Sequence, residues 1–121
     1  MRVQLILLLL GASFWCSSQV IKPIKWHQSI SVSDDQTTAK IIFTAKIDPD
    51  WYLYSSDFDP ALGPYVTEFV FTPDESYKLL GSIQPQAPSS AYDSIFMGTY
   101  TYFKKTGVFI QNIQLNDLNY Q

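Results

Sequence analysis

The strongest constraint in this sequence is the alternation of apolar and polar residues along most of its length. Alternation with a period of two places successive side chains on opposite faces of a β-strand, whereas a helix needs a period of about 3.6 residues, which no segment shows convincingly. The clearest strand covers residues 39–47, whose apolar face consists of Ala39, Ile41, Phe43, Ala45 and Ile47. Its opposite face carries Lys40, Thr44 and Lys46. The sequence therefore predicts an all-β fold.

Turn residues divide the rest of the chain into further short strands. We predict these strands over residues 26–32, 51–55, 66–72, 77–83, 100–103 and 108–115. Lys104 to Gly107 predicts a hairpin with the glycine at the turn. Residues 84–90 contain two prolines, so they cannot form a central strand, and residues 94–98 read as irregular. Strand signals spaced about 8–12 residues apart, with no helix between them, are typical of a β-sandwich.

The first 18 residues have the pattern of a secretory signal peptide. Arg2 precedes the apolar run 3–10, and small residues occupy the −3 and −1 positions before Gln19. The run is too short to span a bilayer, which takes about 20 apolar residues. We expect cleavage before Gln19. The alternatives are a lipoprotein acylated at Cys16, disfavoured because Trp15 precedes the cysteine, and an uncleaved N-terminal anchor.

Removal of the leader leaves a single domain, residues 19–121, which is long enough for one modest core. This domain carries seven lysines and eleven acidic residues, a net charge of −4, which argues against binding to nucleic acid. The sole cysteine, Cys16, lies in the leader. The exported domain must therefore be held together by packing alone, and it cannot carry out thiol chemistry by itself.

The remaining chemistry-bearing residues favour structural roles, and we expect no metal and no cofactor. His27 is the only histidine and reads as an exposed strand residue, and zinc sites need several nitrogen or sulfur ligands. The densest carboxylate cluster consists of Asp48, Asp50, Asp57 and Asp59. Prolines follow two of these aspartates and no glutamate closes the loop, so turn formation explains them better than a calcium site does.

Trp51, Tyr52 and Tyr54 place three aromatic residues within four positions. Adjacent residues of a strand point to opposite faces, so Trp51 and Tyr52 cannot both face the same core. Exposed tyrosines are common in binding surfaces, whereas a second packed layer would bury them. The sequence leaves both interpretations open.

Six segments, in order, give the chain a resemblance to a known family. They are Asp50-Trp51-Tyr52-Leu53-Tyr54-Ser55, Gly63-Pro64, Thr67-Glu68-Phe69-Val70-Phe71, Ala91-Tyr92-Asp93-Ser94-Ile95-Phe96-Met97-Gly98, Tyr102-Phe103 and the strand 108–113. Together they resemble the N-terminal periplasmic domain of DsbD, the thiol:disulfide interchange protein, and look closest to the versions found in Bacteroidetes. The resemblance covers residues 24–115 and rests on the order and spacing of these motifs.

The resemblance implies an immunoglobulin-like β-sandwich in the periplasm that takes part in thiol–disulfide exchange. In the family, a cysteine pair takes electrons from the membrane-embedded part of the reductase and passes them to oxidised periplasmic redox proteins. Tyr52 and Tyr54 match the family's Tyr-x-Tyr motif beside those cysteines, which implies that they bind partners. Phe96 and Met97 match the cap loop, where an aromatic residue, here Phe96, covers the disulfide until a partner displaces it.

The sequence departs from the family where the chemistry should lie. In relatives the cysteine pair lies on a last hairpin, beyond the strand that matches residues 108–115, and neither cysteine is present here. We expect a fragment of a protein-disulfide reductase that lacks the last two strands and is inactive as written, the alternative being a complete redox-inactive protein. Two other functions stay open. One is a cysteine-free exported module that binds a protein through Tyr52, Tyr54 and residues 95–97, and the other is an adhesin-type sandwich without a site.

Overall fold

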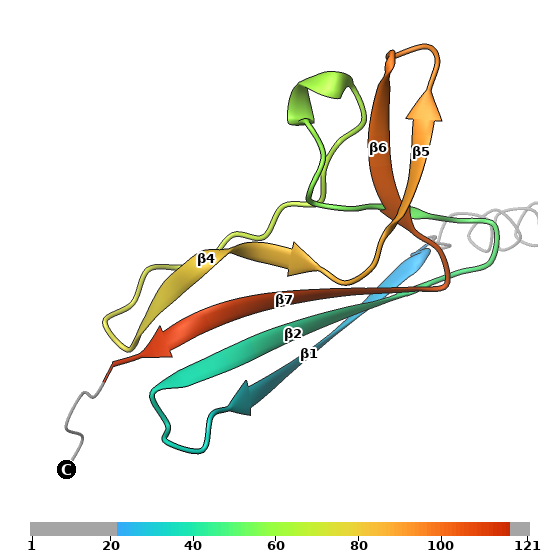
Figure 1. The fold of residues 1–121 in the computed structure, drawn as a ribbon. Helices are drawn as coiled ribbons and strands as arrows, with labels where there is room; N and C mark the ends of the chain where they lie inside the picture. Colours follow the sequence, from blue (N-terminus) through green and yellow to red (C-terminus); the bar gives the residue numbers. More distant parts are fainter. Residues whose placement is uncertain (1–21, 117–121) are drawn as a thin grey trace, which may run out of the picture.

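The computed structural model describes residues 22–116, which form β-strands in two antiparallel sheets and one short 3₁₀ turn (Figure 1). The four-stranded sheet has the order β1 (Ile24–Val32), β2 (Thr38–Ile47), β7 (Thr106–Leu115) and β4 (Tyr77–Pro85). The three-stranded sheet has the order β3 (Leu53–Tyr54), β6 (Gly98–Phe103) and β5 (Ser89–Asp93). The 3₁₀ turn η1 covers Pro60–Leu62. The predicted all-β sandwich is thus confirmed, while the predictions for the leader and Cys16 lie outside the described residues.

The core lies on one face of the four-stranded sheet, between its two central strands and the segments that cross them. The register places Phe43 opposite Phe109 and Ala39 opposite Ile113, so the apolar faces of β2 and β7 coincide. The buried cluster consists of Phe43, Ala45, Ile47, Phe103 and Phe109. The apolar face expected for residues 39–47 is therefore confirmed.

The hairpin expected at residues 104–107 is wrong, because β6 and β7 belong to different sheets and do not pair with each other. The expected position of the glycine is wrong as well. The turn is made by Lys104 and Lys105, and Lys105 takes the left-handed φ of 67°. Gly107 lies in β7 instead, where a Cβ atom would lie 3.0 Å from Cγ of Phe103. The glycine is needed for the close approach of a core ring rather than for the turn.

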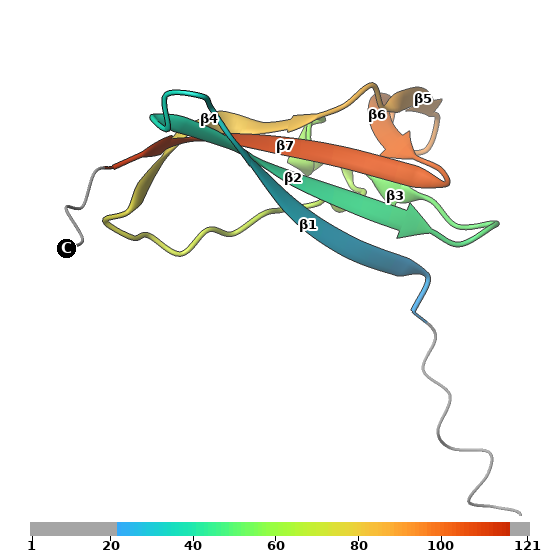
Figure 2. The same cartoon turned by 90° about the horizontal axis from the view of Figure 1, so that it is seen from below.

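The strand expected over residues 66–72 is wrong, although its apolar face is right. Phe69 and Phe71 pack against the core cluster, as the alternation predicted. The segment runs from η1 to the start of β4 as an extended coil (Figure 2). Within residues 22–116, its only backbone hydrogen bond to another backbone group is from the Thr67 amide to the Ser55 carbonyl (3.1 Å). A β-strand requires a ladder with a neighbour, and the described chain supplies none here.

The remaining differences concern edges. The strand expected over 51–55 shrinks to β3, and β5 was not predicted. Both β4, which ends at Pro85, and β5, which begins just after Pro88, lie at sheet edges, where the missing amide of proline costs no ladder bond. In the part of the chain that is described, no helix is long and apolar enough to cross a membrane.

The core-facing side of β1 stays largely uncovered. Its register pairs Trp26 with Ala45, Ile30 with Ile41 and Val32 with Ala39, so these side chains share the face that carries the core. Their exposed fractions are nevertheless 46%, 61% and 48%. The sandwich is closed over β2 and β7 and open over β1.

Candidate functional site

One face of the three-stranded sheet is built from tyrosines. Tyr52 and Tyr54 are two residues apart and therefore point to the same side, and Tyr54 pairs with Tyr102 across β3 and β6. The ring centroids lie 5.3 Å apart for Tyr52 and Tyr54, 5.8 Å for Tyr52 and Tyr102, and 5.6 Å for Tyr54 and Tyr100. Phe58 extends this tyrosine face, 5.9 Å from Tyr54. The structure thus brings the two predicted partner-binding residues together.

The opposite face of the same sheet explains why the tyrosines point outward. Leu53 and Phe103, which pair across β3 and β6, face the core and pack in or against its cluster. Tyr52 on the other side stays exposed and Tyr54 half-buried. A tyrosine suits such a position because its ring packs while its hydroxyl reaches water.

Hydrogen bonding couples the two central tyrosines. Their hydroxyl oxygens lie 3.2 Å apart. The pKa of Tyr54 is raised to about 12. The hydrogen bond with Tyr52 is the largest cause, and burial is the second largest. Burial also raises the pKa of Tyr100. The hydroxyls of Tyr54 and Tyr100 are therefore neutral at physiological pH and offer hydrogen bonds rather than a nucleophile.

The loop of residues 94–97 joins β5 to β6 and is held from both sides. One carboxylate oxygen of Asp93 accepts hydrogen bonds from the amides of Ile95 (2.8 Å) and Phe96 (3.0 Å). The ring of Phe96 lies directly on Gly63, where any Cβ would overlap it. A Cβ at Gly98 would likewise overlap Leu62. The loop is thereby anchored on η1.

Phe96 and Met97, the predicted cap residues, are half-exposed and mostly exposed, respectively. Met97 has a left-handed φ of 58°, which places it at the turn. Among the described residues, no ring pair joins Phe96 to the tyrosine face. Loop and tyrosine face are built on the same sheet, but Phe96 rests on Gly63 rather than on Tyr52 or Tyr54.

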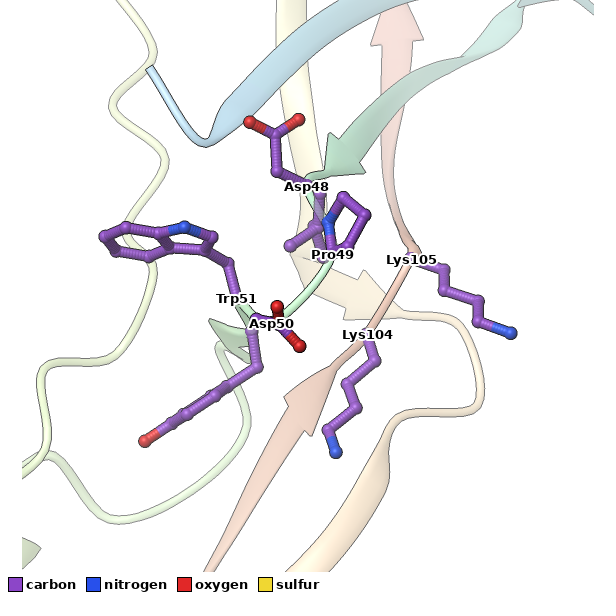
Figure 3. Close-up of a pocket in the computed structure, with 8 residues that line it drawn as sticks. Asp48, Pro49, Asp50, Trp51, Lys104 and Lys105 are labelled. Atoms are coloured by element: carbon purple, nitrogen blue, oxygen red, sulfur yellow. The ribbon is translucent and has the colours of Figure 1, made fainter. Parts of the chain in front are cut away.

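Sequence reasoning missed Tyr100, Tyr102 and Phe58 as members of the tyrosine face. The available signal was Tyr100-Thr101-Tyr102, which repeats the spacing of Tyr52 and Tyr54. Trp51 does not join these rings. It lines one hollow together with Lys104 and Lys105, but its indole points away from these two lysines (Figure 3).

Of the other candidate residues, His27 and Asp59 take the structural roles expected of them, whereas Asp57 bonds to a distant strand. His27 is exposed on β1. Asp59 caps η1 by accepting a hydrogen bond from the Ala61 amide (2.9 Å), and Asp57 accepts one from the Thr101 hydroxyl. Within residues 22–116, no group of three or more histidine, cysteine, aspartate or glutamate side chains is arranged to hold a metal ion.

Fold and site together define a β-sandwich with an aromatic surface beside an anchored loop. The sequence model of the family described as "Thiol:disulfide interchange protein DsbD, N-terminal" matches residues 18–120. This chain therefore belongs to the DsbD N-terminal domain family, whose members are thiol–disulfide interchange domains. A search of curated proteins and a search of solved structures found no match. The Bacteroidetes-type subdivision stays a prediction.

Proposed function

We propose that this chain is the periplasmic electron-transfer domain of a DsbD-type protein and that it is inactive without a cysteine pair. The family match over residues 18–120 carries the proposal. In the exchange, a thiolate of the reduced domain attacks a partner disulfide, and the second thiol resolves the mixed disulfide. Two electrons and two protons pass to the partner, and the domain's cysteines become a disulfide. A DsbD-type membrane domain would supply the electrons, and periplasmic redox proteins would receive them.

The open side of the sandwich supports a position for the missing cysteines. Beside the uncovered face of β1, a hollow of about 460 Å³ is lined by Trp26, Phe43 and the segment 67–71. Val70 in that segment is 92% exposed. An apolar face next to an unpaired extended segment is a feature that natural sandwiches normally cover. We propose that two further strands cover it and that the hairpin between them holds the cysteine pair next to the 94–97 loop.

The tyrosine face and the 94–97 loop would then have different roles, one in binding the partner and the other in shielding the cysteines. Tyr52 and Tyr54 would contact the redox partner, since an exposed and a half-buried tyrosine with adjacent hydroxyls suit a protein interface. Phe96 and Met97 would shield the cysteines in the resting state. The Asp93 hydrogen bonds hold the backbone of the loop, so a partner would displace the two side chains without unfolding the hairpin.

The first experiment is the intact mass of the native exported protein, measured with and without a thiol-alkylating reagent after reduction. A product longer than residues 19–121 that gains two labels is the expected result. A mass equal to residues 19–121 with no label would contradict thiol chemistry. It would leave a cysteine-free protein-binding module as the function of the same tyrosine face.

Alanine variants test the recognition residues separately. Tyr52→Ala and Tyr54→Ala should each weaken binding to the oxidised partner about tenfold or more, the size of effect expected at an interface hot spot. Phe96→Ala should speed alkylation of the cysteines in the native protein. Leu79→Ala is the matched control, because Leu79 is a comparably exposed large side chain near the far end of β4. Equal effects of Tyr52→Ala and Leu79→Ala would refute the assignment.

A further inference from the structure

Charge is unevenly distributed over the described residues. The basic end of the four-stranded sheet carries five exposed lysines and only two acidic residues, Asp48 and Asp50, which gives a net charge of +3. Its lysines are Lys22, Lys25, Lys46, Lys104 and Lys105. The other described residues carry two lysines and eight acidic side chains, a net charge of −6. A protein that is acidic overall thus presents one basic end.

The strand register explains why lysines distant in sequence meet there. Lys25 lies opposite Lys46 in the β1–β2 ladder, and Lys46 lies opposite Thr106, which directly follows Lys104 and Lys105. The Ile47 amide donates a hydrogen bond to the Lys105 carbonyl (2.9 Å). Like charges directly opposite each other destabilise a sheet. The pairing of Lys25 with Lys46 therefore has a cost, which a negatively charged partner at this end would relieve.

Aromatic residues accompany the lysines. Figure 3 shows Lys104 and Lys105 extending to one side of the Asp48–Trp51 loop and the indole of Trp51 extending to the other. The half-exposed Trp51 and Tyr52 line the same hollow as the two lysines. This hollow has a volume of about 620 Å³. Lysine together with tryptophan and tyrosine is the combination typical of the membrane–water interface.

We propose that the basic end docks on the anionic headgroup surface of a lipid bilayer and that the acidic far end faces away from it. The tryptophan and tyrosine rings that line a hollow together with the lysines favour a membrane over an acidic protein, because these aromatic residues are enriched at membrane–water interfaces. This docking is independent of the proposed redox function.

Binding of the exported protein to lipid vesicles tests the docking. Vesicles of phosphatidylcholine with phosphatidylglycerol should bind it, vesicles of phosphatidylcholine alone should not, and about 0.5 M salt should release it. Each lysine near an anionic surface adds about fivefold in affinity, so Lys104→Gln with Lys105→Gln should weaken binding at least about tenfold. Lys40→Gln with Lys78→Gln is the matched control, because it removes two charges near the opposite end of the same sheet. We expect it to change binding less than about twofold.

Three outcomes would overturn the proposal. Equal binding to neutral vesicles would remove the electrostatic basis. Equal losses in the two double variants would show that net charge, and not the basic end, decides binding. Salt-sensitive binding to polyglutamate together with none to anionic vesicles would assign the basic end to an acidic protein instead.

Discussion

Phe109 and Tyr54 have similar aromatic surroundings and opposite roles. Phe109 packs against the rings of Trp26, Phe69 and Phe103 at centroid distances of 6.0, 4.9 and 5.1 Å. Tyr54 packs against those of Tyr52, Phe58 and Tyr100 at 5.3, 5.9 and 5.6 Å. Yet Phe109 is fully buried, while Tyr54 belongs to a face that stays partly in water. Ring spacing does not separate core from surface. The difference lies in what covers each ring. The three-stranded sheet and the segment 66–72 cover the core-facing side of β7, whereas nothing in the described residues covers the outer face of β3 and β6.

The largest expected effect is the difference in the free energy of unfolding between alanine variants of these two rings. Phe109→Ala should lower the free energy of unfolding by about 3–5 kcal/mol, because it leaves a cavity in the centre of the core. Tyr54→Ala should cost at most about half as much, since solvent can fill part of the space that the ring leaves. Urea unfolding of both variants measures the difference. Equal losses would mean that the tyrosine face is a second core.

The unpaired segment 66–72 allows a test of which of its two sides is buried in the native protein. Phe69→Ala should destabilise the protein by about 2–3 kcal/mol, because the ring packs 4.8 Å from Phe43 and 4.9 Å from Phe109. Val70→Ala, its neighbour on the exposed side, should stay within about 0.5 kcal/mol. The same urea measurement applies. A costly Val70→Ala variant would show that the exposed side of the segment is covered in the native protein.

The smallest expected effect is the dependence of stability on pH. It arises at Tyr54 and not at Phe109, because phenylalanine has no ionisable group. The pKa of Tyr54 is raised to about 12 in the folded protein, above its value of about 10 in an unfolded chain. The stabilisation from the neutral hydroxyl is therefore fully present below about pH 10 and is lost as the pH rises through about 12. Tyr52→Phe removes the hydrogen bond and should lower the pKa of Tyr54 towards its ordinary value. An absorbance titration of the tyrosines checks this, and an unchanged final ionisation step in Tyr52→Phe would contradict it.

Local sequence predicted all four strands of the four-stranded sheet, including the edge strands β1 and β4. The alternation over residues 39–47 and 108–115 matches β2 and β7, the central strands, within two residues at each end. It failed at residues 66–72, where the same alternation produces an apolar face but no ladder. It also missed β5, because Pro88 precedes a strand that needs only one neighbour. Propensity describes one segment, whereas pairing depends on a second segment elsewhere in the chain.

The candidate site divides in the same way. Tyr52 and Tyr54 stand out in the sequence, and their spacing alone places them on one face. Tyr100 and Tyr102 join them only because β3 pairs with β6, about fifty residues later in the chain. Phe96 is conspicuous in the sequence, but its seat on Gly63 arises from the packing of the β5–β6 loop against η1.

By itself the sequence determined which side chains share a face, because the two-residue repeat follows from the geometry of an extended backbone. It also determined the all-β class and the family. Only the tertiary structure decided which of those faces are covered, so that Phe109 became core while Trp26 and Tyr52 stayed exposed. It also decided that five lysines meet at one end of a sheet. The physical reason is that burial and charge proximity depend on neighbours contributed by remote segments, which no local pattern contains.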